Sequence, residues 1–351
     1  MRNIILLVDH ILDPRLKKKI LLFKRYKSQV SIFQDESRGS HVGKKRILGV
    51  KYYPYYSFYR LGHISMSTIY ISGVKVMIHH LLTLLILKQR NLIVLEVPDL
   101  PMRSRYALVN KFYVQLFSIL VKIIAHKIVV TSNPFKTELP RMNTLLVENI
   151  MKEELLWKFL KVEPVSNQKR RTVKIGVVGA LRYVCQLEII FRYVSENDLG
   201  VELHIYGGPE IAISSLLHKY NNNIFYWGVY DYDQDIIDIY KRLDYVYAVY
   251  DAMQPNVKMA LPNKLYECGL AHRRILVAEN TYLSSVVEKN SLGLSLPSSL
   301  HDFDEFRRRL DEDIQNRNYI QNNKLFSQKI FENNHHQQTG LVNFVGLTTN
   351  E

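Results

Sequence analysis

A repeated alternation of short apolar runs and amphipathic segments constrains the fold of this chain more than any other feature. In the first half, apolar runs such as Ile4–Val8 and Leu92–Val97 are short and continuous, as in buried parallel strands, and helical patterns follow them. A polar stretch at 161–172 interrupts the alternation, which starts again at Val173. This order predicts an α/β protein with two doubly wound, Rossmann-like parallel sheets facing each other across a ligand-binding cleft.

The length of 351 residues suits two domains of ordinary size. We place the first domain at residues 1–165 and the second at 166–330, because the polar stretch between them has the composition of a linker. The last segment, 331–351, contains the polar run 333–338 (Asn-Asn-His-His-Gln-Gln). This composition predicts a tail that is poorly ordered or packs back on the chain.

Positive charge is concentrated in the first half of the chain. Residues 1–160 contain 26 Lys and Arg against 10 Asp and Glu, a net charge of +16, whereas 161–351 contain 21 against 23, a net charge of −2. The basic clusters are Lys17–Lys19, Lys24-Arg25 and Lys44–Arg46. Such a half suits a nucleic acid, an anionic membrane surface or a substrate that carries phosphates, and a solvated basic face explains any single cluster equally well.

The cysteine content and the apolar segments indicate where the protein works. Cys185 and Cys268 are the only cysteines, which argues against a disulfide framework and favours a reducing compartment. The N-terminal apolar run is too short for a secretion signal. The apolar segments 69–87 and 112–130 contain Lys and His, and neither gives the roughly 20 nearly uncharged residues of a membrane span. We expect a cytoplasmic protein that is soluble or lies on a membrane without crossing it.

Two motifs of the second half fall where a predicted strand ends and a helix begins. Gly179 follows the strand 173–178, with Arg182 close behind, so backbone amides, a helix N-terminus and a cation could hold a phosphate there. A glycine required only for a tight turn is the alternative.

The segment Pro262–Glu267 opens a helix with Lys264 and Glu267 in its first turn. Because Lys264 opposes the helix dipole, we interpret it as the partner of an external anion, with Glu267 free to accept hydrogen bonds from ribose hydroxyls.

Other acidic residues are weaker candidates. Asp231, Asp233 and Asp235 form two Asp-x-Asp pairs of a kind that holds metal in some transferases, but a helix cap, assigned to Asp233, is the simpler explanation. The histidines and cysteines lack metal-ligand spacing, so we expect no metal and no other cofactor. Asp99, between two prolines at a strand end, is the candidate general base for an acceptor hydroxyl.

Other residues compete with Asp99 for this role. They are Glu96, in the same predicted strand, and the pair Asp9-His10, after the first strand. A turn residue whose side chain bonds its own backbone is the alternative explanation for each of these carboxylates.

The second half resembles the nucleotide-binding domain of GT-B glycosyltransferases of the family 4 type, especially bacterial enzymes that assemble capsular or surface polysaccharides. The matching motifs run from Val173 to about Leu294: Gly179-Ala-Leu-Arg182, Ile205-Tyr-Gly-Gly208, Phe225-Tyr-Trp-Gly228, Ile239-Tyr-Lys-Arg-Leu-Asp244, Tyr250-Asp251, Pro262-Asn-Lys-Leu-Tyr-Glu267, and Ile275-Leu-Val-Ala278 with Gly293. The first half matches more loosely, through Asp13-Pro14-Arg15 and Thr131-Ser-Asn-Pro-Phe135.

The resemblance implies a role for each matching residue of the donor site. Glu267 would bind the donor ribose, Arg182 and Lys264 its diphosphate, and the segment from Gly228 to Tyr230 would form part of the wall around the base. Asn263 and Lys258 would complete the donor contacts. GT-B enzymes generally need no bound metal.

One position departs from the pattern of the family. Retaining members often carry a second glutamate eight residues before the ribose-binding one. Here that position is Met259, with Lys258 and Asn256 close by. The donor-sugar contacts and the stereochemical outcome of the reaction therefore stay open.

These observations predict a glycosyltransferase that moves a sugar from a nucleotide-diphosphate donor, preferably a UDP-sugar, to a lipid-linked glycan acceptor in surface polysaccharide assembly. The basic half would dock on the anionic inner face of the cell membrane, and high salt should then release the protein.

Three other functions stay open. A sugar-nucleotide epimerase on the same fold would leave the basic half unexplained. A nucleic-acid-binding protein would use the basic half with Tyr52, Tyr53, Tyr55 and Tyr56, but the second half lacks a basic excess, so no nucleic acid is expected. A non-catalytic scaffold is the third.

Overall fold

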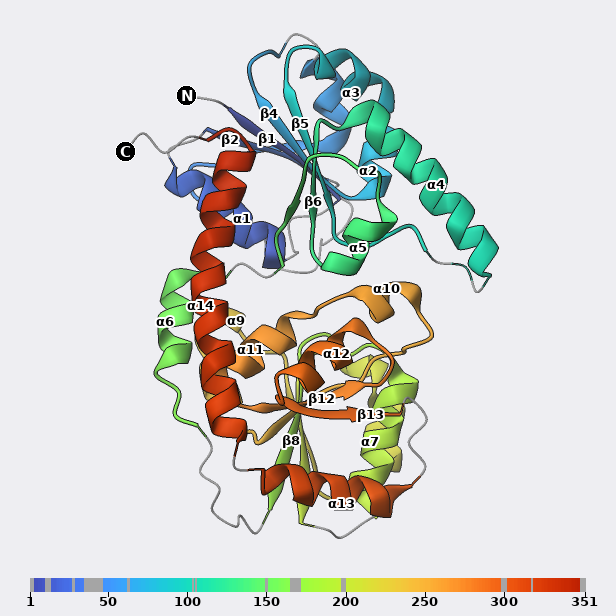
Figure 1. Ribbon diagram of the computed structural model, residues 1–351, viewed down its shortest axis with the longest axis vertical. Helices are drawn as coiled ribbons and strands as arrows, with labels where there is room; N and C mark the ends of the chain where they lie inside the picture. The colour runs from blue at the N-terminus through green and yellow to red at the C-terminus, as the bar shows by residue number, and fades with distance from the viewer. Residues whose placement is uncertain are drawn as a thin grey trace. The chain divides into compact units, whose positions relative to one another are not determined.

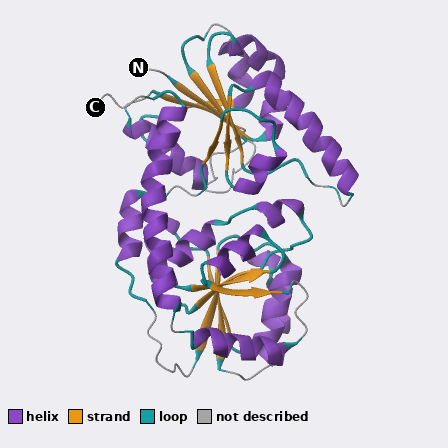
Figure 2. Cartoon of the chain, viewed as in Figure 1, coloured by secondary structure: helices purple, strands orange, loops and turns teal. Residues whose placement is uncertain are grey.

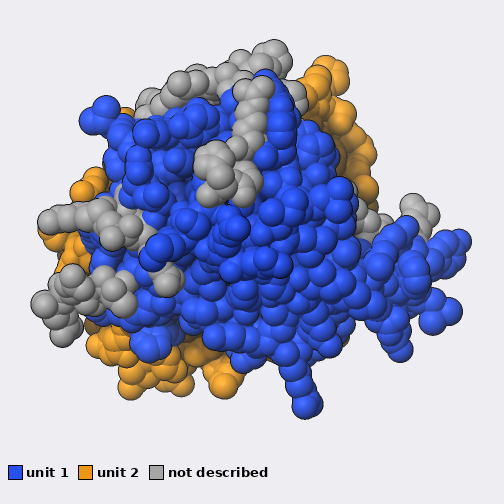
Figure 3. All heavy atoms as spheres, turned by 90° about the horizontal axis from the view of Figure 1, so that it is seen from above, with its two compact units in different colours: residues 1–151, 333–351 blue, residues 152–332 orange. Residues whose placement is uncertain are grey.

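The computed structural model describes residues 3–9, 14–26, 29–34, 47–61, 64–102, 104, 106–148, 151–164, 172–196, 200–297, 302–316 and 318–347. The chain divides into two compact units, residues 1–151 with 333–351, and residues 152–332 (Figure 3). Each unit is built on one sheet with helices packed against it (Figures 1 and 2). The predicted pair of doubly wound parallel sheets is confirmed.

The sheet of the first unit has seven strands in the order β3-β2-β1-β4-β5-β6-β7, and every pair is parallel. The strands are β1 (Ile4–Val8), β2 (Val30–Gln34), β3 (Lys51–Pro54), β4 (Thr68–Ser72), β5 (Leu92–Val97), β6 (Lys127–Val130) and β7 (Thr144–Leu146). The strand order reverses at β1, which pairs with β2 on one side and β4 on the other. A ligand of this unit is therefore expected near the carboxyl ends of β1 and β4.

Helices connect the strands of the first unit. They are α1 (Pro14–Arg25), the 3-10 helix η1 (Tyr55–Leu61), α2 (Val74–His79), α3 (Leu81–Lys88), α4 (Ala107–Ile124) and α5 (Asn133–Glu138). Apolar side chains of α1 and of the end of α14 (Tyr319–Phe344) pack against one face of β1, β2 and β4 and form the core there.

The sheet of the second unit has six parallel strands in the order β10-β9-β8-β11-β12-β13. The strands are β8 (Val173–Val178), β9 (Val201–Tyr206), β10 (Ile224–Gly228), β11 (Tyr245–Ala248), β12 (Arg274–Ala278) and β13 (Gly293–Leu296). The helices are α6 (Glu153–Leu160), α7 (Val184–Glu196), η2 (Glu210–Ala212), α8 (Ser214–Lys219), α9 (Tyr232–Lys241), α10 (Pro255–Met259), α11 (Asn263–Ala271), α12 (Tyr282–Lys289) and α13 (Phe303–Ile314). The order reverses at β8, between β9 and β11.

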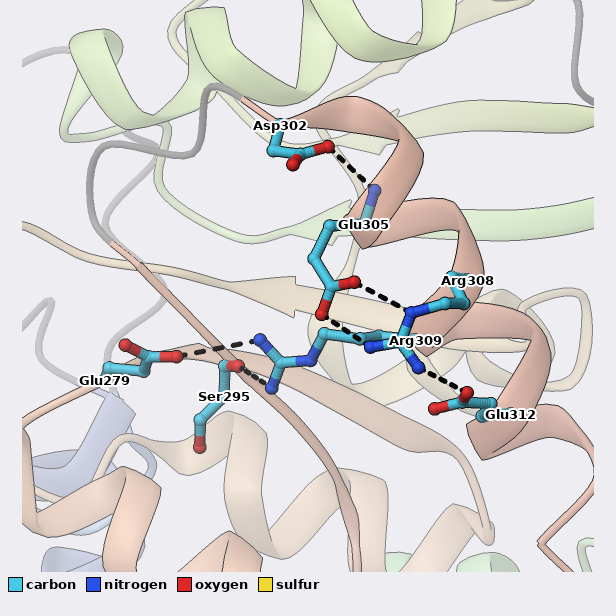
Figure 4. A network of polar contacts seen from close by, with 7 residues as sticks. All are labelled: Glu279, Ser295, Asp302, Glu305, Arg308, Arg309 and Glu312. Atoms are coloured by element: carbon cyan, nitrogen blue, oxygen red, sulfur yellow. Dashed lines mark hydrogen bonds and ion pairs between the residues drawn. The ribbon is translucent and has the colours of Figure 1, made fainter.

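Polar contacts hold α13 against the sheet of the second unit (Figure 4). The Asp302 carboxylate accepts the N–H of Glu305 at 2.8 Å and caps the helix, and Glu305 forms two hydrogen bonds with Arg308. Arg309 donates to the backbone oxygen of Ser295 in β13 at 2.7 Å. The Glu305–Arg308 pair is solvent-exposed, so the cap and the Arg309 contact fix α13 more than this pair does.

Of the two arrangements expected for the tail, the described residues 331–347 show the one that packs back on the chain, because α14 continues to Phe344. Residues 333–347 belong to the first unit, and the rest of α14 belongs to the second. Two residues of the polar run 333–338 are buried and satisfied: Asn334 accepts the N–H of Met151 at 2.7 Å, and Gln338 donates to the oxygen of Met151 at 3.1 Å. The units divide between Met151 and Lys152, ahead of the polar stretch 161–172.

Candidate functional site

Three neighbouring strands of the second unit end in glycines at the edge where the strand order reverses. Gly179 after β8, Gly207 after β9 and Gly228 at the end of β10 have φ values of 107°, 141° and 77°. The Gly179 N–H donates to the oxygen of Tyr206, and the Gly207 N–H donates to the oxygen of Gly228, each at 2.7 Å. A Cβ on Gly207 would lie only 1.8 Å from the oxygen of Gly179, so only glycine fits this crossing.

Lys264 lies over the Gly179 turn. A Cβ on Gly179 would lie 3.6 Å from both Cε and Nζ of Lys264, so the turn and the ammonium group are in contact range. Lys264 is in the first turn of α11, and its side chain is only 13% exposed. The helix α7 begins five residues after Gly179. The predicted proximity of Gly179 and Lys264 is therefore present, and it places a cation beside the glycine turn.

Glu267 holds the ammonium group of Lys264. Its Oε2 accepts from Lys264 Nζ at 2.8 Å and from the hydroxyl of Tyr240 at 2.7 Å, and its Oε1 accepts from the hydroxyl of Tyr232 at 2.8 Å. The carboxylate is fully buried. Because the carboxylate is fully buried as the side chains lie, Glu267 reaches a ribose hydroxyl only when a neighbouring side chain moves.

The electrostatics keep both members of this pair charged. Burial acts to raise the pKa of Glu267, but the charge of Lys264 and three hydrogen bonds act to lower it. Their combined effect is larger than that of burial, so the pKa lies below its ordinary value. Burial acts to lower the pKa of Lys264, yet the Glu267 carboxylate more than offsets this and the pKa is raised. Burial and the same carboxylate raise the pKa values of Tyr232 and Tyr240, so both tyrosines stay neutral donors.

The two tyrosines on α9 were not among the predicted site residues. Tyr240 falls in the apolar stripe of α9 with Ile236 and Ile237, where a sequence pattern indicates a core residue and nothing marks it as the partner of a carboxylate. Tyr232, the first residue of α9, lies between Asp231 and Asp233, and the sequence does not mark it as a partner of Glu267 either.

The other predicted donor residues lie around the pair rather than within it. Tyr230 is half-buried, close enough to Lys264 and Glu267 for their charges to act on it, although burial is the largest cause of its raised pKa. Asn263 is the first residue of α11. Arg182 and Lys258 are exposed, at the start of α7 and the end of α10. The structure thus brings Gly179, Lys264 and Glu267 together and leaves the two further cations in solvent.

The aspartates near the start of α9 serve the helix. Asp231, not Asp233, is the cap: its Oδ1 accepts the N–H of Asp233 at 2.9 Å. Asp235 accepts the N–H of Asp231 at 2.8 Å, and Asp233 is paired with Lys152 at 2.6 Å. Over the described ranges, no group of three or more His, Cys, Asp or Glu side chains is arranged to hold a metal ion.

In the first unit, a cavity of about 220 Å³ lies at the carboxyl ends of β1 and β4. It is lined by Asp9, Tyr55, Lys75, Val76, Ile78 and His79. Asp9 follows β1 directly, and Lys75 and His79 belong to α2, which follows β4. A carboxylate, a lysine and a histidine therefore meet where this sheet is expected to bind its ligand.

The two other predicted carboxylates of the first unit lie elsewhere. Asp99 is exposed at the end of β5 and is not among the residues that line the cavity. Glu96 is buried, paired with Lys19, and accepts a hydrogen bond from the hydroxyl of Tyr70 at 2.9 Å. Glu96 is therefore a structural residue and not a rival base.

The basic cluster Lys17–Lys19 is also not a free surface, because Lys18 and Lys19 are only 5% and 4% exposed. Three further features named from the sequence fall outside the described residues: His10, Asp13 and the cluster Lys44–Arg46.

No family model matches the chain, and no curated protein matches it in sequence. Solved structures match it over almost its full length. Alr3699/HepE from Anabaena, in complex with UDP-glucose, superposes with a TM-score of 0.70 at 13% identity, covering 97% of this chain and 99% of that one. Sucrose-phosphate synthase from Thermosynechococcus elongatus gives 0.67 at 13% identity, with 98% and 99% covered. WaaG, a glycosyltransferase involved in lipopolysaccharide biosynthesis, gives 0.65 at 9%, with 99% and 100% covered.

The chain has the GT-B fold. At these identities the likeness establishes the architecture of the two GT-B domains, and the resemblance drawn from the sequence is confirmed to that extent. In a GT-B protein the switch point of the second unit, with Gly179 and Lys264, is the place where the strand order itself predicts a nucleotide.

Proposed function

We propose that this protein is a glycosyltransferase that moves a sugar from a nucleotide-diphosphate donor to a hydroxyl group of an acceptor. The observation that carries the proposal is the buried ammonium group of Lys264, held by Glu267 over the Gly179 turn. This arrangement lies at the carboxyl edge of a doubly wound sheet, where such folds bind nucleotides. We favour UDP as the nucleotide, because HepE was solved with UDP-glucose.

The chemistry that this site can supply is stabilisation of the departing diphosphate. When the bond between sugar and phosphate breaks, negative charge grows on the phosphate oxygens, and a fixed cation in a poorly hydrated position stabilises that charge strongly. Lys264 meets both conditions, since it is little exposed and its position is fixed by an ion pair. The start of α7 adds backbone amides that favour an anion. Arg182 is the second cation within this proposal.

Glu267 has two possible contributions, and they can be separated. In the first, it only fixes Lys264; in the second, its carboxylate exchanges the Tyr232 hydroxyl for a ribose hydroxyl. Binding of UDP and of 2′-deoxy-UDP to wild type and to Glu267→Gln distinguishes them. If Glu267 binds the ribose, the substitution weakens UDP more than the deoxy nucleotide. If it only fixes Lys264, both lose affinity equally.

We place the acceptor at the cavity of the first unit. The acceptor hydroxyl gives up its proton as it attacks the sugar, and a carboxylate within hydrogen-bond reach can take that proton. Asp9 lines the cavity, whereas Asp99, the residue selected from the sequence, is exposed at a different strand end. We therefore favour Asp9 over Asp99 as the base. Lys75, across the same cavity, is suited to a phosphate of the acceptor.

We further propose that the acceptor is a lipid-linked glycan and that the protein works in surface polysaccharide assembly, on the cytoplasmic face of an anionic membrane. The basic excess of the first half supports this placement, and WaaG, of similar fold, is a glycosyltransferase of lipopolysaccharide biosynthesis. Transfer is expected to need no divalent metal, because Lys264 supplies the charge for the diphosphate. Activity that survives a chelator would support this point.

The test of the function is release of UDP from UDP-sugars in the presence of extracted lipid-linked acceptors. Release that requires both donor and acceptor supports glycosyl transfer. Conversion of the UDP-sugar without acceptor and without UDP release would identify an epimerase instead. Nucleotide binding without any turnover would favour a scaffold, and salt-sensitive binding of oligonucleotides without nucleotide binding would favour a nucleic-acid-binding protein.

A further inference from the structure

Helix α4 is buried along a single stripe and carries large apolar side chains on most of its remaining surface. The buried stripe is Asn110, Val114, Phe117, Val121 and Ile124. Away from it, Leu108 is 82% exposed, Phe112 62% and Ile119 55%, and Val109, Tyr113, Leu116 and Ile123 are exposed as well. Within the described ranges, α4 is the one helix whose length and composition would allow it to cross a membrane. The buried stripe of α4 packs within the first unit, so α4 cannot leave that unit to cross a membrane.

Helix α3 adds to this exposed apolar surface. Leu82 and Ile86 of α3 are 76% and 66% exposed, and Leu85 is also exposed. The ends of the two helices are joined, because Lys88 of α3 donates to the backbone oxygen of Ile123 in α4 at 2.7 Å. Figure 1 shows α3 beside one end of α4 in the first unit. We call the exposed apolar residues of both helices the α3/α4 surface. Soluble proteins rarely leave so many large apolar side chains of neighbouring helices in water.

The charge of the surrounding chain indicates what covers the α3/α4 surface. The described residues from 64 to 137, which include α3 and α4, contain seven Lys and Arg and only two acidic residues, Glu96 and Asp99, and Glu96 is neutralised by Lys19. Lys111 and Lys122 of α4 are exposed among its apolar side chains. A second copy of the chain would bring two basic surfaces together, which is unfavourable. An anionic bilayer has an apolar interior that can take up the exposed apolar side chains, and negatively charged headgroups that attract the exposed lysines.

We infer that the α3/α4 surface docks on an anionic phospholipid bilayer, with α4 lying in the interface and its apolar side chains inserted among the lipids. The inference rests on the proposed function for its biological setting, and it goes further by naming the docking element and its mode of binding. Tyr113 and Phe112 are residue types suited to the interface, and the exposed lysines reach the headgroups. Because apolar insertion does not depend on ionic strength, high salt weakens docking without abolishing it.

The test is flotation of the full chain with vesicles of equal amounts of phosphatidylcholine and phosphatidylglycerol, without any substrate. The wild type is expected to float. The double variant Phe112→Ser with Leu116→Ser, at two exposed positions, is expected to partition roughly tenfold more weakly or worse. The matched control is Leu325→Ser, on α14 in the second unit, where the side chain is 50% exposed; it should float like the wild type.

Three results would overturn the inference. They are flotation of the double variant at the level of wild type, a wild type that does not float, and a dimer in sedimentation that the double substitution dissociates. The last would show that a second copy covers the surface. UDP binding is measured separately on the same proteins, so failure of the proposed function and failure of membrane docking can be told apart. A protein that floats but binds no nucleotide contradicts the proposed function and not the docking.

Discussion

The Nζ atom of Lys264 lies 2.8 Å from Oε2 of Glu267, one helical turn further along α11, and the carboxylate is fully buried. An ion pair so placed costs desolvation energy that a core of apolar residues would avoid. Here the pair lies at the switch point of a parallel sheet and over a glycine turn, where an anion has access to one of its members. The stability of the second unit and the proposed binding of a diphosphate therefore depend on the same two side chains.

Breaking this pair from the carboxylate side should destabilise the protein. In Glu267→Ala, Lys264 stays buried without its counter-charge, and removal of one partner of a buried pair typically costs about 3–5 kcal/mol. Urea denaturation measures the change. The control is Asp238→Ala, whose partner Lys241 is about half-exposed; loss of that pair should cost about 1 kcal/mol or less. Equal losses in the two variants would contradict a special role of the buried pair.

Glycine should be required at Gly207 far more strictly than at Gly228. In Gly207→Ala the new Cβ would lie 1.8 Å from the oxygen of Gly179, so the ends of β8 and β9 must separate. Gly228 also has a positive φ, but no atom lies within 4 Å of its Cβ position, and alanine there should cost about 1–2 kcal/mol. Gly207→Ala should lose more stability than this and also lose nucleotide binding. Similar stability of the two variants in urea would show that the backbone can shift to accept a side chain where Gly207 approaches Gly179.

The stability of the first unit should depend on pH through His80. Burial, and next to it the charge of His79, lower the pKa of His80 from its ordinary 6.5 to about 4. Below 6.5 the unfolded chain takes up a proton that the folded chain does not, so stability falls from 6.5 towards 4, by at most about 1.4 kcal/mol per pH unit. Above 6.5 the effect is absent, because the residue is neutral in both states.

His80→Phe isolates this effect. The ring packs against Phe58 at 5.1 Å, which phenylalanine can preserve, but the substitution removes the hydrogen bond of His80 with the backbone of Tyr55. In urea denaturation at neutral pH the variant should be less stable by about 1 kcal/mol, the typical worth of the lost hydrogen bond, and on acidification the wild type should lose stability relative to the variant. Parallel curves for both proteins down to about pH 4 would refute the assignment.

The choice between the two carboxylates of the first unit predicts different kinetics. Asp9→Asn should lower turnover roughly 100-fold or more, because it removes the proposed base from the cavity. Asp99→Asn should change turnover only a few-fold, since Asp99 does not line that cavity. Neither substitution should alter donor binding, which is the control for correct folding. A larger loss in Asp99→Asn would restore the base selected from the sequence.

The regular alternation made much of the fold predictable, but one central strand escaped detection. The strand β4, Thr68–Ser72, lies at the start of the continuous apolar segment 69–87, and a single residue, Gly73, separates it from α2. The division between the units was also placed too late. The short helix α6 precedes the polar stretch, yet its Phe159 packs on Tyr240 with ring centres 5.9 Å apart, so it belongs to the second unit.

In the candidate donor site, the positions of residues at strand ends and helix starts could be predicted from the sequence. The burial of side chains could not, because it depends on how other elements pack. Gly179 and Lys264 follow from the strand ends and come together as expected. Burial of Glu267 could not be read from its motif, because it depends on Tyr232 and Tyr240, contributed by another helix. Likewise, the exposure of α4 depends on which neighbours cover its apolar residues, and its sequence pattern alone is that of a core helix.

The most direct test of nucleotide recognition is calorimetric titration of the purified protein with UDP, GDP and ADP. The informative variant is Lys264→Met combined with Glu267→Gln, which removes the proposed cation without leaving a buried unpaired charge, and Lys241→Met is the exposed control. We predict that one diphosphate nucleotide, UDP, binds the wild type and the control, and that the double variant binds it at least roughly tenfold more weakly. Unchanged binding by the double variant, or no binding of any of the three nucleotides to the wild type, would contradict the assignment of the site.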